Sequence, residues 1–218
     1  MKQYQYGIDI NTLEKFITQP EFQTFEWGRL ATLVSVPEFR LVRIDSNQGK
    51  VARVAGDARF ESTFFIESGS AVINGIEIGE LETITIAPRE EWNISVKESS
   101  VLYAFLGSAH ASREYSKKSK PFDYREKYWG NIQTIVSKEY TGKRLFVRKG
   151  TNASLEYHCR KTEAYFIHSG KLLLRLRAGR GEDRVFPLQE GTVAFTPPGL
   201  MHQRGGLEDT VIIEISTR

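Results

Sequence analysis

The sequence predicts an all-β protein made of two tandem copies of one domain. Short runs rich in β-branched and aromatic residues recur along the 218 residues, and glycine, asparagine and proline separate them. Many short strands with frequent turns favour a sandwich or a barrel. One stretch of the first half also returns in the second half about a hundred residues later, a period that indicates duplicated domains rather than a solenoid.

The internal repeat is clearest around two Trp-Gly steps. Residues 26–35 read EWGRLATLVS, and residues 128–137 read YWGNIQTIVS. We expect the copies to occupy residues 1–110 and 125–218, because the polar, Lys/Ser-rich stretch at 111–124 ends in a Pro-containing segment that suits a linker. A second sign of duplication is that the spacing from Gly49 to Gly69 equals the spacing from Gly150 to Gly170.

The elements follow from local sequence. One helix is expected before the first copy, because Asn11 can cap it, Glu14 follows three residues later as in a capping box, and Pro20 ends it. Strands are expected where β-branched and aromatic residues cluster between turn residues. These strands are 40–44, 63–66, 71–73, 83–86, 145–148, 164–168, 172–177, 192–195 and 211–215.

Composition and charge exclude several classes of function. A net charge of +3 is too small for a nucleic-acid binder, and the dense basic cluster at 117–120 lies in a stretch typical of a solvated linker. Cys159 is the single cysteine, so no intrachain disulfide is possible. The N-terminus lacks a signal-peptide core, and no run approaches the ~20 apolar residues that span a bilayer. We expect a cytoplasmic protein that binds a small-molecule substrate and neither nucleic acid nor membrane.

Two histidines and two glutamates of the second copy stand at spacings that suit a metal site. Successive residues of a strand point to opposite faces, so Glu156 and His158 are expected on one face. A short turn then brings Glu163 back on the adjoining strand, and His202 arrives from a hairpin that a Pro-Pro-Gly turn positions. Imidazole and carboxylate ligands suit one divalent ion, whether Zn, Mn, Fe or Ni. Two carboxylates would neutralise that ion, and four ligands leave positions for water or substrate.

The two stretches resemble the signature motifs of the cupin superfamily. The first motif runs Gly, five residues, His-x-His, three or four residues, Glu, six residues, Gly, and residues 150–170 match it with Glu156 in place of the first histidine. The second runs Gly, five residues, Pro-x-Gly, two residues, His, three residues, Asn, and residues 191–206 match it with Gly206 in place of Asn. The resemblance implies two tandem cupin (double-stranded β-helix, jelly-roll) barrels with metal ligands at Glu156, His158, Glu163 and His202.

The first copy lacks these ligands. Ala55, Asp57 and Ser62 stand at the positions of the first three, and Asn93 falls near the position of the fourth. We expect this domain to keep the fold without a metal and to serve in packing, dimerisation or lining the pocket.

A narrower resemblance relates residues 124–218 to the cupin module of mannose-6-phosphate isomerase-like proteins. YWG at 128–130, KG at 149–150 and SLEYH at 154–158 look like the Pro-Trp-Gly, Lys-x-Gly and Ser-Leu-Gln-x-His of that module. Glu156 replaces the glutamine, which keeps an oxygen ligand and adds a negative charge. The resemblance implies a sugar-related substrate.

From the site and the resemblance we expect a metal-dependent isomerase or epimerase that acts on a carbohydrate or a related polyhydroxy or keto compound. The expected catalytic residues are Glu156 (a ligand or the general base), Arg160 (at the mouth of the pocket) and Tyr165 (in the barrel interior).

Two other functions stay open. His158, Glu163 and His202 alone form the two-histidine, one-carboxylate set of a non-haem iron dioxygenase. A non-enzymatic cupin that binds a small molecule is the other. A homodimer is expected in each case, from the resemblance and because exposed strand edges need covering.

Overall fold

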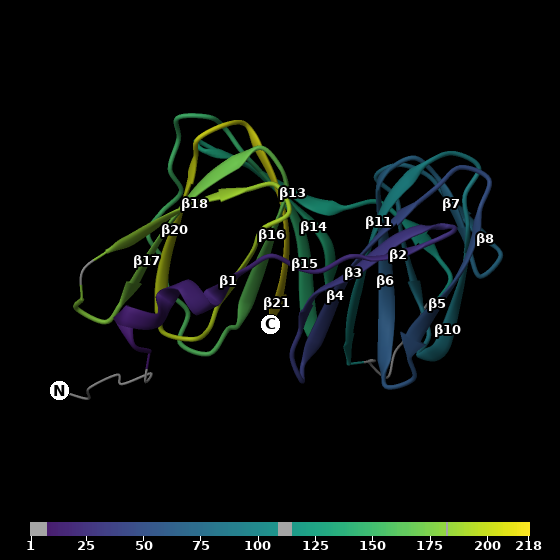
Figure 1. Cartoon of the computed structure of the whole chain (residues 1–218), viewed down its shortest axis with the longest axis horizontal. Coiled ribbons are helices and arrows are strands. Elements are labelled where there is room, and N and C mark those ends of the chain that lie inside the picture. Colours follow the sequence, from purple (N-terminus) through teal and green to yellow (C-terminus); the bar gives the residue numbers. More distant parts are fainter. Residues whose placement is uncertain (1–7, 109–114, 182) are drawn as a thin grey trace. The chain divides into compact units, whose positions relative to one another are not determined.

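The computed structural model describes residues 8–108, 115–181 and 183–218. It is nearly all β, as the sequence predicts, and each of the nine expected strands falls on an observed strand. The chain divides into two compact units (Figure 1). The N-terminal unit holds residues 21–122 and 134–142 together with residue 218, and the C-terminal unit holds residues up to 20, 123–133 and 143–217.

The N-terminal unit has two sheets around one core. The larger sheet has the order β12-β9-β6-β11-β4-β3-β2, and the smaller has the order β5-β10-β7-β8. Apolar side chains of both sheets form a single buried cluster, in which Trp92 packs edge-on against Phe64 at a centroid distance of 5.0 Å. The strands are β2 (Gln23–Phe25), β3 (Gly28–Ser35), β4 (Phe39–Ser46), β5 (Val51–Asp57), β6 (Phe60–Ser68), β7 (Ala71–Ile73), β8 (Ile76–Ile78), β9 (Thr83–Ile86), β10 (Arg89–Ser95), β11 (Ser100–Ser108) and β12 (Lys118–Ser119).

The C-terminal unit repeats this plan. Its larger sheet has the order β1-β19-β16-β21-β15-β14-β13, and its smaller sheet has the order β18-β17-β20. Alternate leucines of β17 are fully buried in the core between the sheets, as period-two patterning requires. The elements are the 3-10 helix η1 (Ile10–Phe16), β1 (Ile17–Thr18), β13 (Phe122–Lys127), β14 (Gly130–Ser137), β15 (Tyr140–Val147), β16 (Glu163–Ser169), β17 (Lys171–Ala178), β18 (Arg184–Gln189), β19 (Val193–Thr196), β20 (Leu200–Gly206) and β21 (Thr210–Thr217). The end of β14 and the start of β15, residues 134–142, belong to the N-terminal unit.

The start of the chain differs from the expected helix. Its helix is a 3-10 turn that Asp9 caps, with the Asp9 carboxylate accepting a hydrogen bond from the Asn11 amide at 2.9 Å. The helix ends at β1 rather than at Pro20. The side chain of the residue before a helix can accept a hydrogen bond from an N–H of the first turn that has no partner within the helix. Asp9 holds this position, whereas Asn11 lies inside the helix and cannot act as the cap.

The compact units also differ from the expected domain boundaries. η1 and β1 precede the first copy but belong to the C-terminal unit, because Ile17 and Thr18 pair with β19. In the same way β12, from the expected linker, pairs with β9 of the N-terminal unit. The segment before each copy therefore covers an edge strand in the sheet of the other copy, which protects that edge. Residues 111–114 of the expected linker lie outside the described residues.

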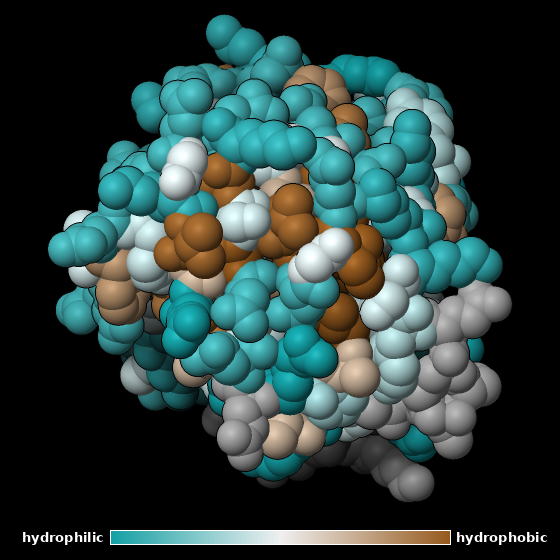
Figure 2. Space-filling view, turned by 90° about the vertical axis from the view of Figure 1, so that its right-hand side faces the viewer, coloured by the Kyte–Doolittle hydropathy of each residue, from teal (hydrophilic) through white to brown (hydrophobic). Residues whose placement is uncertain are grey.

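Figure 2 shows one face of the protein, on the side where Figure 1 draws β7 and β8. Apolar side chains gather near the centre of this face, and hydrophilic side chains surround them. Among residues 8–108, 115–181 and 183–218, no helix has the length and apolar character needed to cross a bilayer.

The Trp-Gly step of the second copy gives a test of this fold. Gly130 has φ 151°, and a Cβ there would lie 1.7 Å from the Phe146 carbonyl oxygen. Gly150 has φ 75° with open space around it. Gly130→Ala should lower the free energy of unfolding by about 2–4 kcal/mol, whereas the matched Gly150→Ala should cost only about 1 kcal/mol of backbone strain. Urea unfolding followed by tryptophan fluorescence measures both, and equal losses would contradict this packing.

Candidate metal centre

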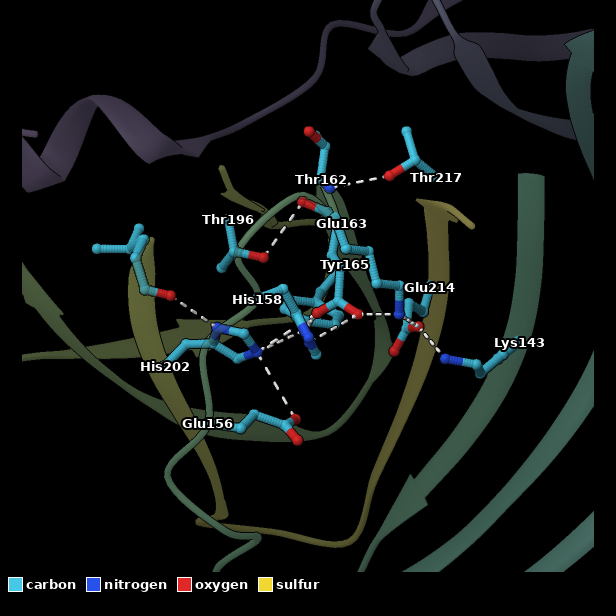
Figure 3. Close-up of polar contacts among 12 residues, drawn as sticks. Lys143, Glu156, His158, Thr162, Glu163, Tyr165, Thr196, His202, Glu214 and Thr217 are labelled. Carbon is cyan, nitrogen blue, oxygen red and sulfur yellow. Dashed lines mark hydrogen bonds and ion pairs between the residues drawn. The ribbon is translucent and has the colours of Figure 1, made fainter. Parts of the chain in front are cut away.

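Three side chains of the C-terminal unit converge as possible metal ligands. One ligand atom from each of Glu156, His158 and His202 lies within 4.8 Å of the others. Within the described part of the chain, this is the group of His, Cys, Asp and Glu side chains that meets this criterion. Figure 3 shows the three side chains pointing toward one another, with Glu163 beside them.

Backbone pairing brings Glu156 and His202 together. The Glu156 amide donates to the His202 carbonyl at 3.0 Å, and the His202 amide donates to the Glu156 carbonyl at 2.8 Å. In such an antiparallel pair the two side chains stand on the same face of the sheet. A further bond from the Gly199 amide to the His158 carbonyl, 2.8 Å long, fixes His158 against the Pro-Pro-Gly turn.

The segment that carries Glu156 and His158 is not the regular strand that the sequence predicts. Between Gly150 and Thr162 the chain forms only isolated bridges, of which Asn152 with Gly205 and Glu156 with His202 lie against β20. The prediction that Glu156 and His158 share a face because they alternate along a regular strand is therefore wrong. The residues meet because single backbone pairs fasten an irregular segment to β20.

Glu163 lies deeper than the other carboxylate. One of its oxygens is 3.4 Å from His158 Nε2 and the other is 3.4 Å from His202 Nε2. Lys161 and the Tyr165 hydroxyl both donate to the Glu163 carboxylate, and Tyr165 also lies 3.0 Å from His202 Nε2. Glu163 begins β16, so its position follows from the large sheet and not from the irregular segment.

The cluster has a buried side and an open side. The side chains of His202 and Glu163 are 1% and 3% exposed, whereas those of Glu156 and His158 are 38% and 31% exposed. A ligand can therefore approach from the side of Glu156 and His158.

The distances fit a divalent ion. Nitrogen and oxygen ligands lie roughly 2.0–2.2 Å from a metal such as zinc, so ligand atoms at ordinary coordination angles are about 3–4.4 Å apart. The separations of 3.4 Å between Glu163 and each histidine, and of 3.6 Å between Glu156 and His202, fall in this range. Glu156, His158 and His202 thus suit a divalent metal in chemistry and spacing, and Glu163 lies beside both histidines.

Arg204 was not predicted from the sequence, yet it touches the site. Its guanidinium donates to Glu156 at 2.5 Å and to Glu214 at 3.4 Å, and it lies over the rings of Trp129 and Tyr165. Arg204 is only 5% exposed. The signal was present in the sequence, because residues two apart on a strand share a face and Arg204 follows His202 by two.

The other expected catalytic residues lie in different surroundings. Tyr165 is fully buried, as expected, and burial raises its pKa well above the usual value, so the phenol stays protonated. Arg160 is exposed in the turn after His158, and the neighbouring Lys161 is the cation that reaches Glu163. The catalytic roles of Glu156, Arg160 and Tyr165 remain predictions.

Hydrogen bonds and charges shift the titration of the ligands. Burial opposes ionisation of Glu163, but hydrogen bonds from His158 and His202 and the charges of Lys161 and Arg204 outweigh it, and the pKa of Glu163 is far below its ordinary value. The pKa of Glu156 is also lowered, chiefly by its hydrogen bond with His202. For His202, burial acts to lower the pKa, but hydrogen bonds to Glu156 and Glu163 raise it overall.

The equivalent region of the N-terminal unit is built differently. Ala55 and Asn93 are exposed on β5 and β10, and Asp57 pairs with Arg59 at 2.8 Å and with Arg40 at 3.4 Å. Ser62 is buried. Arginines thus pair with Asp57, which is the carboxylate among these four positions.

No protein-family model and no curated protein matches the sequence. Solved structures match in fold. A structure of Bacillus subtilis oxalate decarboxylase, studied for its Mn(II) centres, is 13% identical with a TM-score of 0.70, and the match covers 92% of this chain and 76% of that chain. A mutant of the same enzyme is 12% identical with a TM-score of 0.71 and the same coverage. An oxalate decarboxylase structure concerned with proton-coupled electron transfer is 14% identical with a TM-score of 0.72, over 91% of this chain and 76% of that chain.

The chain therefore has a fold similar to that of oxalate decarboxylase. At these identities the likeness concerns the fold alone.

The lowered pKa of Glu163 predicts how acid affects the metal-free protein. A carboxyl whose pKa is lower in the folded state stabilises the fold above its unfolded pKa of about 4.3, and this contribution is lost as the pH falls toward the folded value. The free energy of unfolding should therefore fall less steeply between about pH 6 and pH 3 in Glu163→Gln than in the parent chain. Urea unfolding across this range measures the difference, and parallel curves would show that Glu163 is not held ionised.

Proposed function

We propose that the protein is a metal-dependent cupin enzyme whose ion is held by Glu156, His158, Glu163 and His202. The observation that carries this proposal is the convergence of Glu156, His158 and His202 at ligand spacing, with Glu163 3.4 Å from both histidines and one side open. The two-domain cupin layout and the Mn(II) centres of the structural neighbour support it.

For the reaction, we propose isomerisation or epimerisation of a carbohydrate or a related polyhydroxy or keto compound. The resemblance of residues 124–218 to the mannose-6-phosphate isomerase-like module supports this reaction. When bound, the metal would polarise a carbonyl oxygen and so acidify the neighbouring C–H.

The chain's own residues would orient the reacting groups. Lys161 and Tyr165 hold Glu163 by hydrogen bonds, so that this carboxylate keeps one orientation. Arg204 and His202 hold Glu156 ionised at neutral pH. A carboxylate in this state can ligate the ion or accept a proton, which keeps both proposed roles of Glu156 open.

One observation favours the iron dioxygenase as a second candidate. Arg204 binds a Glu156 oxygen at 2.5 Å, and Glu163, which Lys161 and Tyr165 contact, lies 3.4 Å from both histidines. If Arg204 retains Glu156, then His158, Glu163 and His202 remain as a two-histidine, one-carboxylate set.

Metal binding is the first test. The purified chain should bind one equivalent of Mn(II), seen as loss of the free-ion EPR signal, and His202→Ala should weaken this binding by more than roughly 100-fold. His168→Ala is the matched control, because this histidine of β16 is outside the ligand group. Equal binding by the parent chain and His202→Ala would contradict the site.

Solvent exchange tests the reaction. An isomerase or epimerase that moves a proton next to a carbonyl should incorporate deuterium from D2O into its substrate, detected by NMR across a panel of aldoses, ketoses and their phosphates. The metal-loaded enzyme should do so under strict anoxia, and Glu156→Gln should lower the rate by about 100-fold or more if Glu156 is the base. Turnover that requires ferrous iron and oxygen would instead favour the dioxygenase.

A further inference from the structure

Positive charge is concentrated on one hairpin of the C-terminal unit. Residues 171–184 run from the start of β17 to the first residue of β18, and they carry five lysine and arginine residues against two acidic residues. This stretch therefore has a net charge of +3, which equals the net charge of the whole chain. The remaining residues carry equal numbers of basic and acidic side chains, so the excess positive charge of the chain lies on this hairpin.

Two of these arginines lie on the outer face of the smaller sheet, β18-β17-β20 (Figure 1). Alternate leucines of β17 are fully buried in the core. Arg175 and Arg177 stand between these leucines along the strand, so their side chains point away from the core. The two side chains are 34% and 32% exposed, which makes this face cationic and accessible to a partner.

Both arginines bind one carboxylate, that of Asp183 directly before β18. Arg177 donates to the two Asp183 oxygens at 2.6 and 3.0 Å, and Arg175 also donates to this carboxylate. Gln203 of β20 accepts from Arg175 at 3.3 Å and so helps to orient it. Guanidinium groups bind a carboxylate through paired N–H···O bonds, so Arg175 and Arg177 together form a carboxylate clamp.

Aliphatic side chains lie beside the carboxylate clamp on the same face. In the register of the sheet, Arg175 stands opposite Val185 of β18, and Arg177 stands opposite Met201 of β20. Val185 is 48% exposed. Among the described residues of these three strands, no phenyl, phenol or indole ring shares this face, because Phe186 packs against the core. The face therefore combines two cations with exposed aliphatic surface.

This combination favours an acidic peptide over a nucleic acid. Proteins bind nucleic acid through many phosphate contacts, and those that bind single strands add aromatic rings that stack on the bases. An extended peptide instead presents every second side chain on one side, so a glutamate and a leucine two residues apart can face the sheet together. The carboxylate clamp and Val185 offer matching contacts to such a pair.

We propose that this outer face docks an extended acidic segment of a partner protein. A carboxylate of the partner replaces Asp183 between Arg175 and Arg177, and an aliphatic side chain two residues away packs against Val185. Without the partner, Asp183 occupies the carboxylate clamp and offsets the repulsion between the two guanidinium groups. The proposal does not depend on the metal site, because His202 of β20 points to the opposite face.

Fluorescence anisotropy with labelled probes tests the proposal on the full chain. The acidic probe is a peptide that repeats Glu-Ser-Leu-Ser three times, and the neutral probe has glutamine in place of glutamate. A single-stranded oligothymidine tests for nucleic acid. In about 0.15 M NaCl, the acidic peptide should bind about tenfold or more tightly than either other probe. Equal binding of both peptides, or tighter binding of the oligothymidine, would overturn the proposal.

Loss of one arginine should weaken this binding. Arg177→Gln should weaken the binding of the acidic peptide by about tenfold or more, because it removes the two-bonded side of the carboxylate clamp. Arg59→Gln is the matched control, because Arg59 also binds an aspartate through two hydrogen bonds but lies in the N-terminal unit. Far-UV circular dichroism shows whether each variant keeps the β fold. Equal losses in folded Arg177→Gln and Arg59→Gln would overturn the proposal.

Loss of the internal carboxylate should have the opposite effect. Asp183→Asn removes the group that competes with the partner's carboxylate, so the acidic peptide should bind several-fold more tightly than to the parent chain. Glu208→Gln is the control for charge, because it removes a carboxylate that pairs with Lys171 at the surface of the same unit. Unchanged or weaker binding to Asp183→Asn, or the same gain in Glu208→Gln, would overturn the proposal.

Discussion

The reciprocal backbone hydrogen bonds between Glu156 and His202 are the constraint on which the metal centre depends. They fasten an irregular segment to β20 and thereby set two ligands face to face. His158 follows from the same attachment, because its carbonyl accepts from Gly199 in the turn before β20. Glu163 is positioned separately, because it begins β16. The candidate centre therefore has a buried side at Glu163 and His202 and a more exposed side at Glu156 and His158, which isolated backbone hydrogen bonds hold in place.

Buried charge links this geometry to function. Inside the unit, Arg204 pairs with Glu156, Lys161 with Glu163 and Lys143 with Glu214. The open side next to Glu156 and His158 is where a ligand can enter.

Most of the strands could be predicted from local patterns of β-branched runs and turn residues, and two motifs with fixed spacing indicated Glu156, His158 and His202, which the structure brings together. The contacts of Glu214 and Lys143 could not, because pairing across strands far apart in sequence creates them. The position of Arg204 beside the site could have been predicted, because Arg204 follows His202 by two residues on the same strand. The pairing of β1 with β19 and the irregular segment before His158 depend on contacts between distant parts of the sequence. Local propensity does not encode such contacts.

Anomalous diffraction at the manganese edge, from crystals of the full chain grown with Mn(II), would locate the ion. We expect one strong peak in the C-terminal unit, within coordination distance of His158, Glu163 and His202, and the map would show whether Glu156 ligates the ion or stays with Arg204. A peak elsewhere in the chain, or no peak beside His202, would contradict the proposed metal site.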